Sequence, residues 1–266
     1  MLYLNEKKSQ CIRLLAAFHF ALNFFADGSM DSQMGGQMDN HRDYLRNGEF
    51  KAVFLDYTGT MVREDEPYTM KLLEYFLTHS SLREPKRALS VVWGLIKKIE
   101  NECRGDAFIG KDEMVDRILD ICVKEYALQG DLPYMHDLWR HSWIHAPLFD
   151  DVKPFFEACL LPVYVVTNDD LCYIRQSLEE KQLTPAGVVA AEMVRACKPH
   201  REIFEEALKM AGVSPREAVH IGDSVVSDAE AARAVSITPI LLDRKGTASQ
   251  AEAGDARIIR TLLELV

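Results

Sequence analysis

The sequence predicts an α/β fold, a Rossmann-like parallel sheet with an inserted four-helix cap domain, and three observations support the sheet. Short apolar runs that end in polar residues occur at 51–56, 161–168 and 218–223, and 237–243 is a fourth run of this kind. Continuous apolar runs are typical of strands that are buried on both faces. Helical patterns alternate with these runs, as they do in parallel sheets. Finally, polar residues close the first three runs, and the carboxyl ends of parallel strands meet at one edge, where ligands bind.

The helices expected around the sheet follow from apolar residues spaced three and four apart. One helix is expected before the second strand, at 152–159, and another after that strand, at 169–181. A third is expected at 199–211, directly after Lys198, and a fourth at 226–235, after the third strand.

Residues 64–146 show only helical periodicity, so we expect a small helical bundle inserted between the first and second strands. The chain is thereby divided into a catalytic core, residues 51–63 and 147–266, and this insert. The four helices are expected at 68–79, 85–103, 111–128 and 133–145.

Residues 1–50 are expected to be an N-terminal extension that is flexible or non-native. Basic residues precede an apolar run at 14–26, an order that resembles a secretory signal, but the run is too short to span a bilayer. Three interpretations stay open: a true start near Met30, Met34 or Met38, a helical extension, or an export signal.

The composition favours a globular protein that binds small molecules. Of 266 residues, 48% are hydrophobic and 27% charged, and the net charge of -10 argues against a nucleic-acid surface. We expect no membrane partner, a cytoplasmic location, and a monomer or homodimer. The cysteines form no CxxC pair and are predicted to be buried free thiols: Cys11, Cys103, Cys122, Cys159, Cys172 and Cys197.

Four motifs occur in a specific order: "DYTGT" at 56–60, Thr167–Asn168 at a strand end, "KPHREIF" at 198–204 and "GDSVVSD" at 222–228. Together they resemble the signature of the haloacid dehalogenase-like hydrolase superfamily over about residues 51–243. The helical insert stands where a phosphatase-like subclass of that family carries a four-helix cap. The resemblance implies a Mg²⁺-dependent hydrolase acting on a small phosphorylated metabolite through an aspartyl-phosphate.

The acidic residues of these motifs also suit a magnesium site on chemical grounds. Mg²⁺ prefers hard oxygen ligands, which Asp56, Asp223 and the backbone carbonyl of Thr58 could provide. Asp228 could hold a metal-bound water or orient Lys198. A helix cap or turn is the alternative role for an aspartate after a strand, and the joint presence of the motifs favours the metal.

The expected phosphate ligands are Thr167, Asn168 and Lys198, and the catalytic residues are Asp56 as nucleophile and Lys198 as its cationic partner. Arg104 and Lys111 flank a Gly-punctuated loop in the insert and could meet an anionic substrate.

At the position of Thr58, the phosphatases of the family carry an aspartate that acts as general acid and base. Threonine cannot exchange a proton near neutral pH, and such help is worth roughly 10²–10⁴-fold in rate. We therefore expect slow hydrolysis and a preference for good leaving groups. Glu64 or Glu66 could supply the missing acid, although a solvated charge run is the commoner meaning.

Two alternatives remain at this stage. A phosphonatase-like enzyme would cleave a carbon–phosphorus bond with an imine-forming lysine of the insert, for which Lys71 is available. A weakly catalytic protein would instead bind Mg²⁺ and a phosphorylated metabolite without turnover. The intact acidic motif at 222–228 argues against a metal-free dehalogenase.

Overall fold

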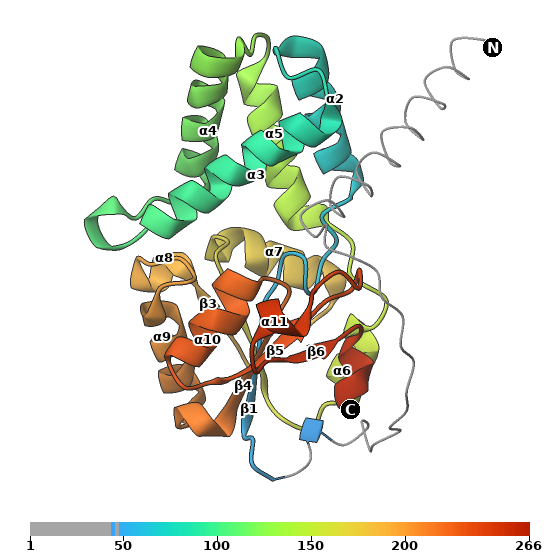
Figure 1. Cartoon of the computed structure of the whole chain (residues 1–266), viewed down its shortest axis with the longest axis vertical. Helices are drawn as coiled ribbons and strands as arrows, with labels where there is room; N and C mark the ends of the chain where they lie inside the picture. Colours follow the sequence, from blue (N-terminus) through green and yellow to red (C-terminus); the bar gives the residue numbers. More distant parts are fainter. Residues whose placement is uncertain (1–43, 46–47) are drawn as a thin grey trace, which may run out of the picture.

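The computed structural model describes residues 44–45 and 48–266, so the predictions for residues 1–43 lie outside the described part. The predicted α/β class is confirmed. Six parallel strands form one sheet in the order β3-β2-β1-β4-β5-β6 (Figure 1). Their bounds are β1 Ala52–Leu55, β2 Val163–Thr167, β3 Gly187–Ala190, β4 Ala218–Gly222, β5 Thr238–Leu242 and β6 Arg257–Ile259.

The four predicted strands are confirmed as β1, β2, β4 and β5, whereas β3 and β6 were not predicted. β3 has four residues and β6 has three, and both lie at the sheet edges. Both edge strands are only partly buried, so they lack the continuous apolar run that marks the equally short central strand β1.

The central strand β1 explains how the core is built. Val53 pairs with Val163 of β2 on one side and with Val219 of β4 on the other. Side chains alternate along the strand, so Phe54 and Leu55 enter different apolar clusters on opposite faces.

Helices cover both faces of this sheet. α9 (Arg201–Ala211) and α10 (Ala231–Ala234) cover the face of Phe54, while α6 (Val152–Ala158) and α7 (Leu171–Lys181) cover the face of Leu55. Two short helices, α8 and α11, span Ala191–Val194 and Gln250–Ala253. The core therefore has three layers, as expected for buried parallel strands.

The expected helix 226–235 differs from the structure. Residues Val225–Glu230 form a turn of π-helix, η5, and only Ala231–Ala234 are α-helical. The Ser224 hydroxyl caps the turn by accepting from the Ser227 amide, and the Asp228 carboxylate accepts from the Ser224 amide. These side-chain bonds draw the first turn toward the end of β4 and alter its winding.

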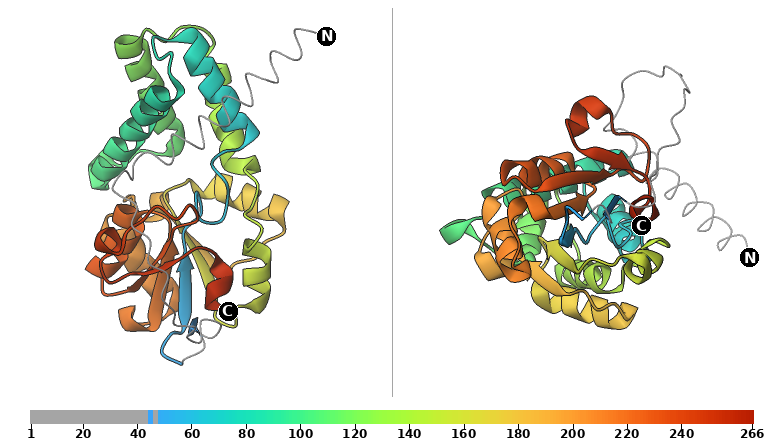
Figure 2. Two further views of the ribbon diagram at one scale, coloured as in Figure 1. Left: turned by 45° about the vertical axis from the view of Figure 1, so that its right-hand side comes forward. Right: turned by 90° about the horizontal axis from the view of Figure 1, so that it is seen from below.

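The helical insert follows β1 and returns to the core before α6. The predicted helices are confirmed as α2 (Pro67–His79), α3 (Pro85–Glu102), α4 (Lys111–Tyr126) and α5 (Leu132–His145). They lie beyond the carboxyl ends of the strands (Figures 1 and 2). The apolar cluster on the Phe54 face continues into this insert through Cys197 and Cys103. Whether residues 64–146 and the core are separate domains stays a prediction.

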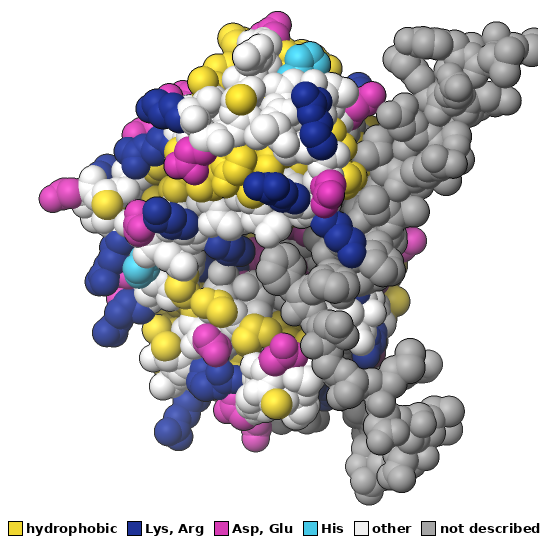
Figure 3. Space-filling view, turned by 45° about the horizontal axis from the view of Figure 1, so that its top comes forward, with side chains coloured by type: hydrophobic (Ala, Val, Ile, Leu, Met, Phe, Trp, Pro, Cys, Tyr) yellow, Lys and Arg dark blue, Asp and Glu magenta, His cyan; other side chains and the backbone are white. Residues whose placement is uncertain are grey.

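On the face in Figure 3, the described Lys and Arg side chains alternate with Asp and Glu side chains. None of the helices among the described residues is long and apolar enough to cross a membrane.

Candidate active site

The predicted nucleophile and the predicted lysine lie together at the carboxyl edge of the sheet. Asp56 follows β1, and Lys198 lies in the loop before α9. The Lys198 Nζ atom donates to Asp56 Oδ1 and to Asp228 Oδ1, each at 2.6 Å. All three side chains are buried. One ammonium group therefore connects the carboxylate that follows β1 with a carboxylate of the turn η5 that follows β4.

Asp228 has the most complete set of partners. Besides Lys198, His220 Nε2 donates to its Oδ1 at 2.8 Å, and the Ser224 amide donates to its Oδ2 at 3.0 Å. Burial would raise the pKa of Asp228, but Lys198 and His220 outweigh burial and hold that pKa below its usual value. These contacts fit the orienting role expected of Asp228, and its role in binding a metal stays a prediction.

Lys198 and His220 respond to the same environment in opposite ways. Burial acts to lower the pKa of Lys198, but the charges of Asp228 and Asp56 outweigh it and raise that pKa above its usual value. Burial also lowers the pKa of His220, and there it prevails over Asp228. The site thus keeps a charged lysine beside a neutral histidine that donates to Asp228.

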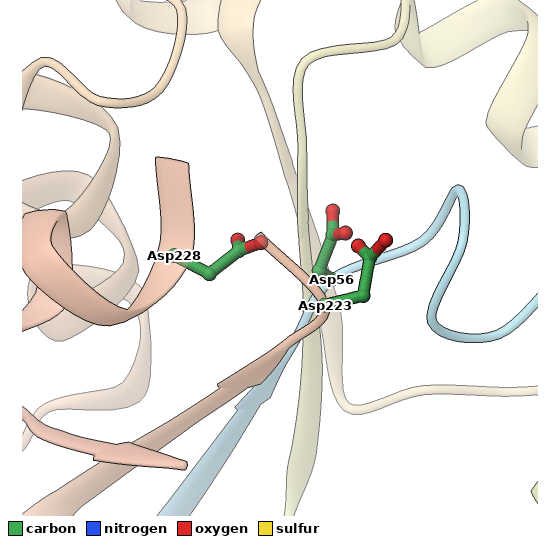
Figure 4. Close-up of side chains that lie close together, drawn as sticks. All are labelled: Asp56, Asp223 and Asp228. Carbon is green, nitrogen blue, oxygen red and sulfur yellow. The ribbon is translucent and has the colours of Figure 1, made fainter. Parts of the chain in front are cut away.

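A third carboxylate, Asp223, follows β4 directly and lies beside Asp56 (Figure 4). Carboxylate oxygens of Asp56, Asp223 and Asp228 lie within 4.8 Å of one another. Gly59 lies in the left-handed region at φ 83°, and a Cβ atom there would stand 2.5 Å from Asp223 Oδ2. Glycine therefore lets the nucleophile loop close against this carboxylate.

Burial and neighbouring carboxylates raise the pKa of Asp56 and of Asp223. Burial raises the pKa of Asp56 well above its usual value; Lys198 opposes this, while Asp228 and Asp223 add to it. The Asp223 side chain is exposed to solvent, but the surrounding protein removes part of its hydration, and this desolvation raises its pKa. The negative charges of Glu64 and Asp228 raise that pKa further. Closely spaced carboxylates with raised pKa values and hard oxygen donors fit a divalent cation such as Mg²⁺.

Sequence reasoning missed Thr60, the last residue of "DYTGT". Its hydroxyl lies 3.3 Å from Asp56 Oδ2 and 3.5 Å from Asp223 Oδ1, and its side chain is fully buried. The hydroxyl connects the two carboxylates on the side opposite Lys198. A small β-branched residue four positions after the aspartate was the available signal.

The predicted phosphate ligands are at the site but have other partners. The Asn168 amide group pairs with the backbone of Lys198, accepting at 2.6 Å and donating at 3.3 Å. The Thr167 hydroxyl donates to Asp169 Oδ2 at 3.0 Å. Asn168 therefore fixes the lysine loop, and phosphate binding by either residue stays a prediction.

Asp169 is the main residue that sequence reasoning missed. Its Oδ2 atom accepts from both Thr58 and Thr167 at 3.0 Å, and its Oδ1 atom lies 3.4 Å from Lys111 Nζ. Thr58 therefore points its hydroxyl at a carboxylate. The two consecutive aspartates at 169 and 170, immediately after a strand, were the sequence signal.

Of the two insert residues predicted to meet substrate, the structure brings Lys111 to the site region and gives Arg104 another partner. Lys111 is buried between Glu100 and Asp169. Burial acts to lower the pKa of Lys111, but Asp169 and Glu100 outweigh it and raise that pKa. Arg104 instead forms an ion pair with Glu202 on α9.

Lys97 of α3 is a second cation that sequence reasoning missed. Its Nζ atom lies 3.4 Å from Ser227 Oγ and 3.4 Å from Glu100 Oε2. Burial acts to lower its pKa, but Glu100 and then Asp223 and Asp228 raise it. A lysine on a helix of the insert therefore faces the acidic cluster of the core.

The two predicted replacement acids differ in position. Glu66 caps α2 by accepting from the amides of Tyr68 and Thr69, so its carboxylate is engaged. Glu64 is partly buried; burial and the charge of Asp56 raise its pKa, while Lys245 and Lys97 oppose the shift. Glu64 is thus the better placed of the two.

Lys71, which the phosphonatase alternative would use, is exposed on α2 and lies over the ring of Tyr68 at 5.4 Å. These contacts give it the character of a surface lysine.

Comparison with known proteins agrees with this arrangement. Residues 50–236 match the family model for haloacid dehalogenase-like hydrolases. The chain belongs to this family. One curated relative is the haloacid dehalogenase-like hydrolase domain-containing protein 3 of Xenopus laevis, 47% identical over 111 residues. The match spans 40% of this chain and 43% of that relative, less than half of its length.

Several solved structures share the family fold. The putative HAD-hydrolase YfnB from Bacillus subtilis, bound to magnesium, matches with a TM-score of 0.66 at 17% identity, covering 82% of this chain and 97% of that one. The L-2-haloacid dehalogenase of Xanthobacter autotrophicus gives 0.64 at 14% identity, over 81% and 96%. A HAD phosphatase from Thermococcus onnurineus gives 0.56 at 22%, over 81% and 96%.

Proposed function

We propose that this hydrolase is a Mg²⁺-dependent phosphatase that transfers the phosphoryl group of a small phosphorylated metabolite to Asp56. The observation that carries the proposal is the arrangement around Asp56. One oxygen accepts from Lys198 at 2.6 Å, and Asp223 and Thr60 lie on the other side. A nucleophilic carboxylate needs nearby positive charge to approach a phosphate dianion.

Asp56 and Asp223 are the residues we expect to hold the cation, with the Thr58 carbonyl and Asp228 as further ligands. Their oxygens are the hard donors that Mg²⁺ prefers, and the spacing of the three carboxylates supports a shared ion. When bound, Mg²⁺ would offset the repulsion between these carboxylates and a phosphate and polarise the phosphoryl oxygens.

The chemistry of the chain's own residues follows from their contacts. An Asp56 oxygen forms a bond to phosphorus while the bond from phosphorus to the leaving oxygen breaks. Lys198 stabilises the negative charge on the phosphoryl oxygens, and Asp228 and His220 keep the lysine in place. Water then attacks the phosphorus of the aspartyl-phosphate, which releases phosphate and restores Asp56.

The proton for the leaving group is the step that this chain performs poorly. The Thr58 hydroxyl donates a hydrogen bond to Asp169, and a hydroxyl cannot act as an acid near neutral pH. We therefore expect acyl and aryl phosphates, whose leaving groups depart without a proton, to be better substrates than alkyl phosphates. Glu64 is the candidate for a replacement acid, because its raised pKa favours the protonated form.

The test is phosphate release from a panel of phosphorylated metabolites and an aryl phosphate, with and without Mg²⁺. We expect release that requires Mg²⁺, is removed by a chelator, and is lost in Asp56→Asn. No release from any compound, in protein shown by calorimetry to bind Mg²⁺, would contradict the proposal and favour a binding protein without turnover.

A further inference from the structure

Two cysteines meet where the helical insert contacts the core. Cys103 ends α3 in the insert, and Cys197 immediately precedes Lys198 in the core. The Cys197 amide donates to the Cys103 carbonyl at 3.0 Å, and the Gly105 amide donates to the Arg195 carbonyl at 2.8 Å. Between these bonds, Arg104 and Ala196 form an antiparallel bridge. The two segments thus pair like short strands, with the cysteines opposite one another.

This pairing brings the cysteines within the range of a disulfide. Facing residues of antiparallel pairs have Cα atoms about 4.5–5.5 Å apart, and disulfides join Cα atoms about 4.4–6.8 Å apart. Each thiol shifts the pKa of the other. The backbone pairing therefore suits a bond between the two sulfur atoms.

Both thiols are buried, so a peroxide must reach them through an opening between the insert and the core, and the surroundings then favour reaction at Cys103. Its Sγ atom accepts from the Ile109 amide at 3.4 Å, and Lys111 lies close enough to attract a thiolate. The neighbouring Cys197 thiol, against the opposing effect of burial, lowers the pKa of Cys103 to about 7. The Cys197 pKa is raised, first by the neighbouring Cys103 thiol and then by burial. One sulfur is thus a nucleophile and the other its protonated partner.

We propose that Cys103 and Cys197 form a reversible disulfide that fixes the insert to the core. The oxidant is a hydroperoxide. The Cys103 thiolate, whose proton has gone to solvent, attacks a peroxide oxygen, and the O–O bond breaks. A sulfenic acid forms, and the departing oxygen takes a proton from solvent and leaves as water or alcohol. The Cys197 sulfur then attacks the sulfenic sulfur, its proton leaves with the hydroxide as water, and the S–S bond forms. Two thiols are oxidised and one peroxide is reduced.

The consequence for turnover rests on the proposed phosphatase activity. The insert lies over the carboxyl ends of the strands (Figure 2), so we infer that movement of the insert against the core controls substrate exchange. A disulfide at residues 103 and 197 joins the two across this boundary and sits next to Lys198. The oxidised protein keeps its site intact but exchanges ligand slowly.

The test treats the folded full-length protein with hydrogen peroxide and maps its peptides by mass spectrometry without reduction. We expect a linked pair of peptides containing residues 103 and 197, abolished in Cys103→Ser and Cys197→Ser and kept in Cys172→Ser, which alters an exposed thiol on α7. Absence of the linked pair in the wild-type protein, where no substitution affects folding, would overturn the proposal.

Phosphate release measured on the same samples separates this inference from the proposed function. We expect oxidation to abolish most of the release and a dithiol reductant to restore it, with no such loss in Cys197→Ser. A linked peptide with unchanged release would overturn the restriction of exchange. A protein inactive under all conditions would contradict the phosphatase proposal, while the peptide map would still test the disulfide.

Discussion

The end of the sheet and the boundary between insert and core both contain buried lysines paired with carboxylates, but they are built differently. At the sheet end, Lys198 bridges Asp56 and Asp228 at 2.6 Å, and backbone bonds to Asn168 fix its loop. At the boundary, Lys111 reaches Glu100 and Asp169 at 3.3 and 3.4 Å from a helix end. Lys198 thus joins groups of the core alone, whereas Lys111 joins the insert to Asp169 of the core.

The largest effect should come from the sheet end. Asp56→Asn removes the nucleophile with little change in shape, so we expect phosphate release to fall by at least about 10³-fold. The unfolding midpoint should change far less than activity. A variant that retains a substantial part of the release would show that another residue accepts the phosphoryl group.

Lys198→Gln should affect both activity and stability. It leaves Asp56 and Asp228 buried without their cation, so we expect a loss of about 3–5 kcal/mol in unfolding free energy. Release should fall by about 10²–10³-fold because charge stabilisation is lost. Urea unfolding and release assays measure the two effects. Lys209→Gln, at an exposed lysine on α9, is the control and should change neither.

Thr58 offers a gain of function that depends on Asp169. Thr58→Asp alone puts a second carboxylate where the hydroxyl now lies 3.0 Å from Asp169 Oδ2, so its benefit is opposed by repulsion. In the double variant Thr58→Asp, Asp169→Asn, we expect alkyl-phosphate turnover to rise by about 10²-fold, which is the low end of the contribution of general acid–base catalysis. The ratio of alkyl to aryl turnover is the measurement, with Asp169→Asn alone as control. An unchanged ratio in the double variant would disprove the leaving-group hypothesis.

At the boundary, Lys111→Gln should have a smaller effect. Glu100 and Asp169 lose a charged partner, which should cost about 1–3 kcal/mol in unfolding free energy. We expect a raised KM with a smaller change in kcat, because Lys111 pairs with Glu100 and Asp169 rather than with the nucleophile Asp56. Lys124→Gln changes an exposed lysine of the same helix and should leave both constants unchanged. A kcat effect as large as that of Lys198→Gln would remove the distinction between the two regions.

The smallest effect concerns the rate of disulfide formation. The Cys103 thiol, with Cys197, Lys111 and Glu100 around it, has a pKa lowered to about 7, so its thiolate forms as pH rises through that value. Because the thiolate is the nucleophile, the initial rate of linked-peptide formation should rise about tenfold from pH 6 to pH 8. A rate that continues to rise steeply above pH 8 would show an ordinary thiol.

The comparison also separates what the sequence could predict from what it could not. Asp56 and Asp223 follow the predicted strands β1 and β4, which pair directly, so parallel pairing brings their side chains together. Lys198 follows no predicted strand, and it was found through the resemblance of the motif at 198–204 to the family signature. Asp169 and Lys97 were not predictable, because their importance depends on which side chains of another element reach them. The prediction of buried thiols was wrong for Cys172, which is exposed, since helical periodicity alone does not determine which face α7 presents.

The central position of β1 has a consequence for how the protein is made. β1 pairs with β2 and β4, whose partner residues for Val53 are Val163 and Val219. The 167 residues from Asp56 to Gly222, the end of β4, require roughly 10–30 s of synthesis at about 5–20 residues per second. During that time the nascent chain carries the nucleophile strand without its partner β4. The ribosome thus releases a catalytically complete site late, and until then the apolar edge of β1 needs protection from other chains.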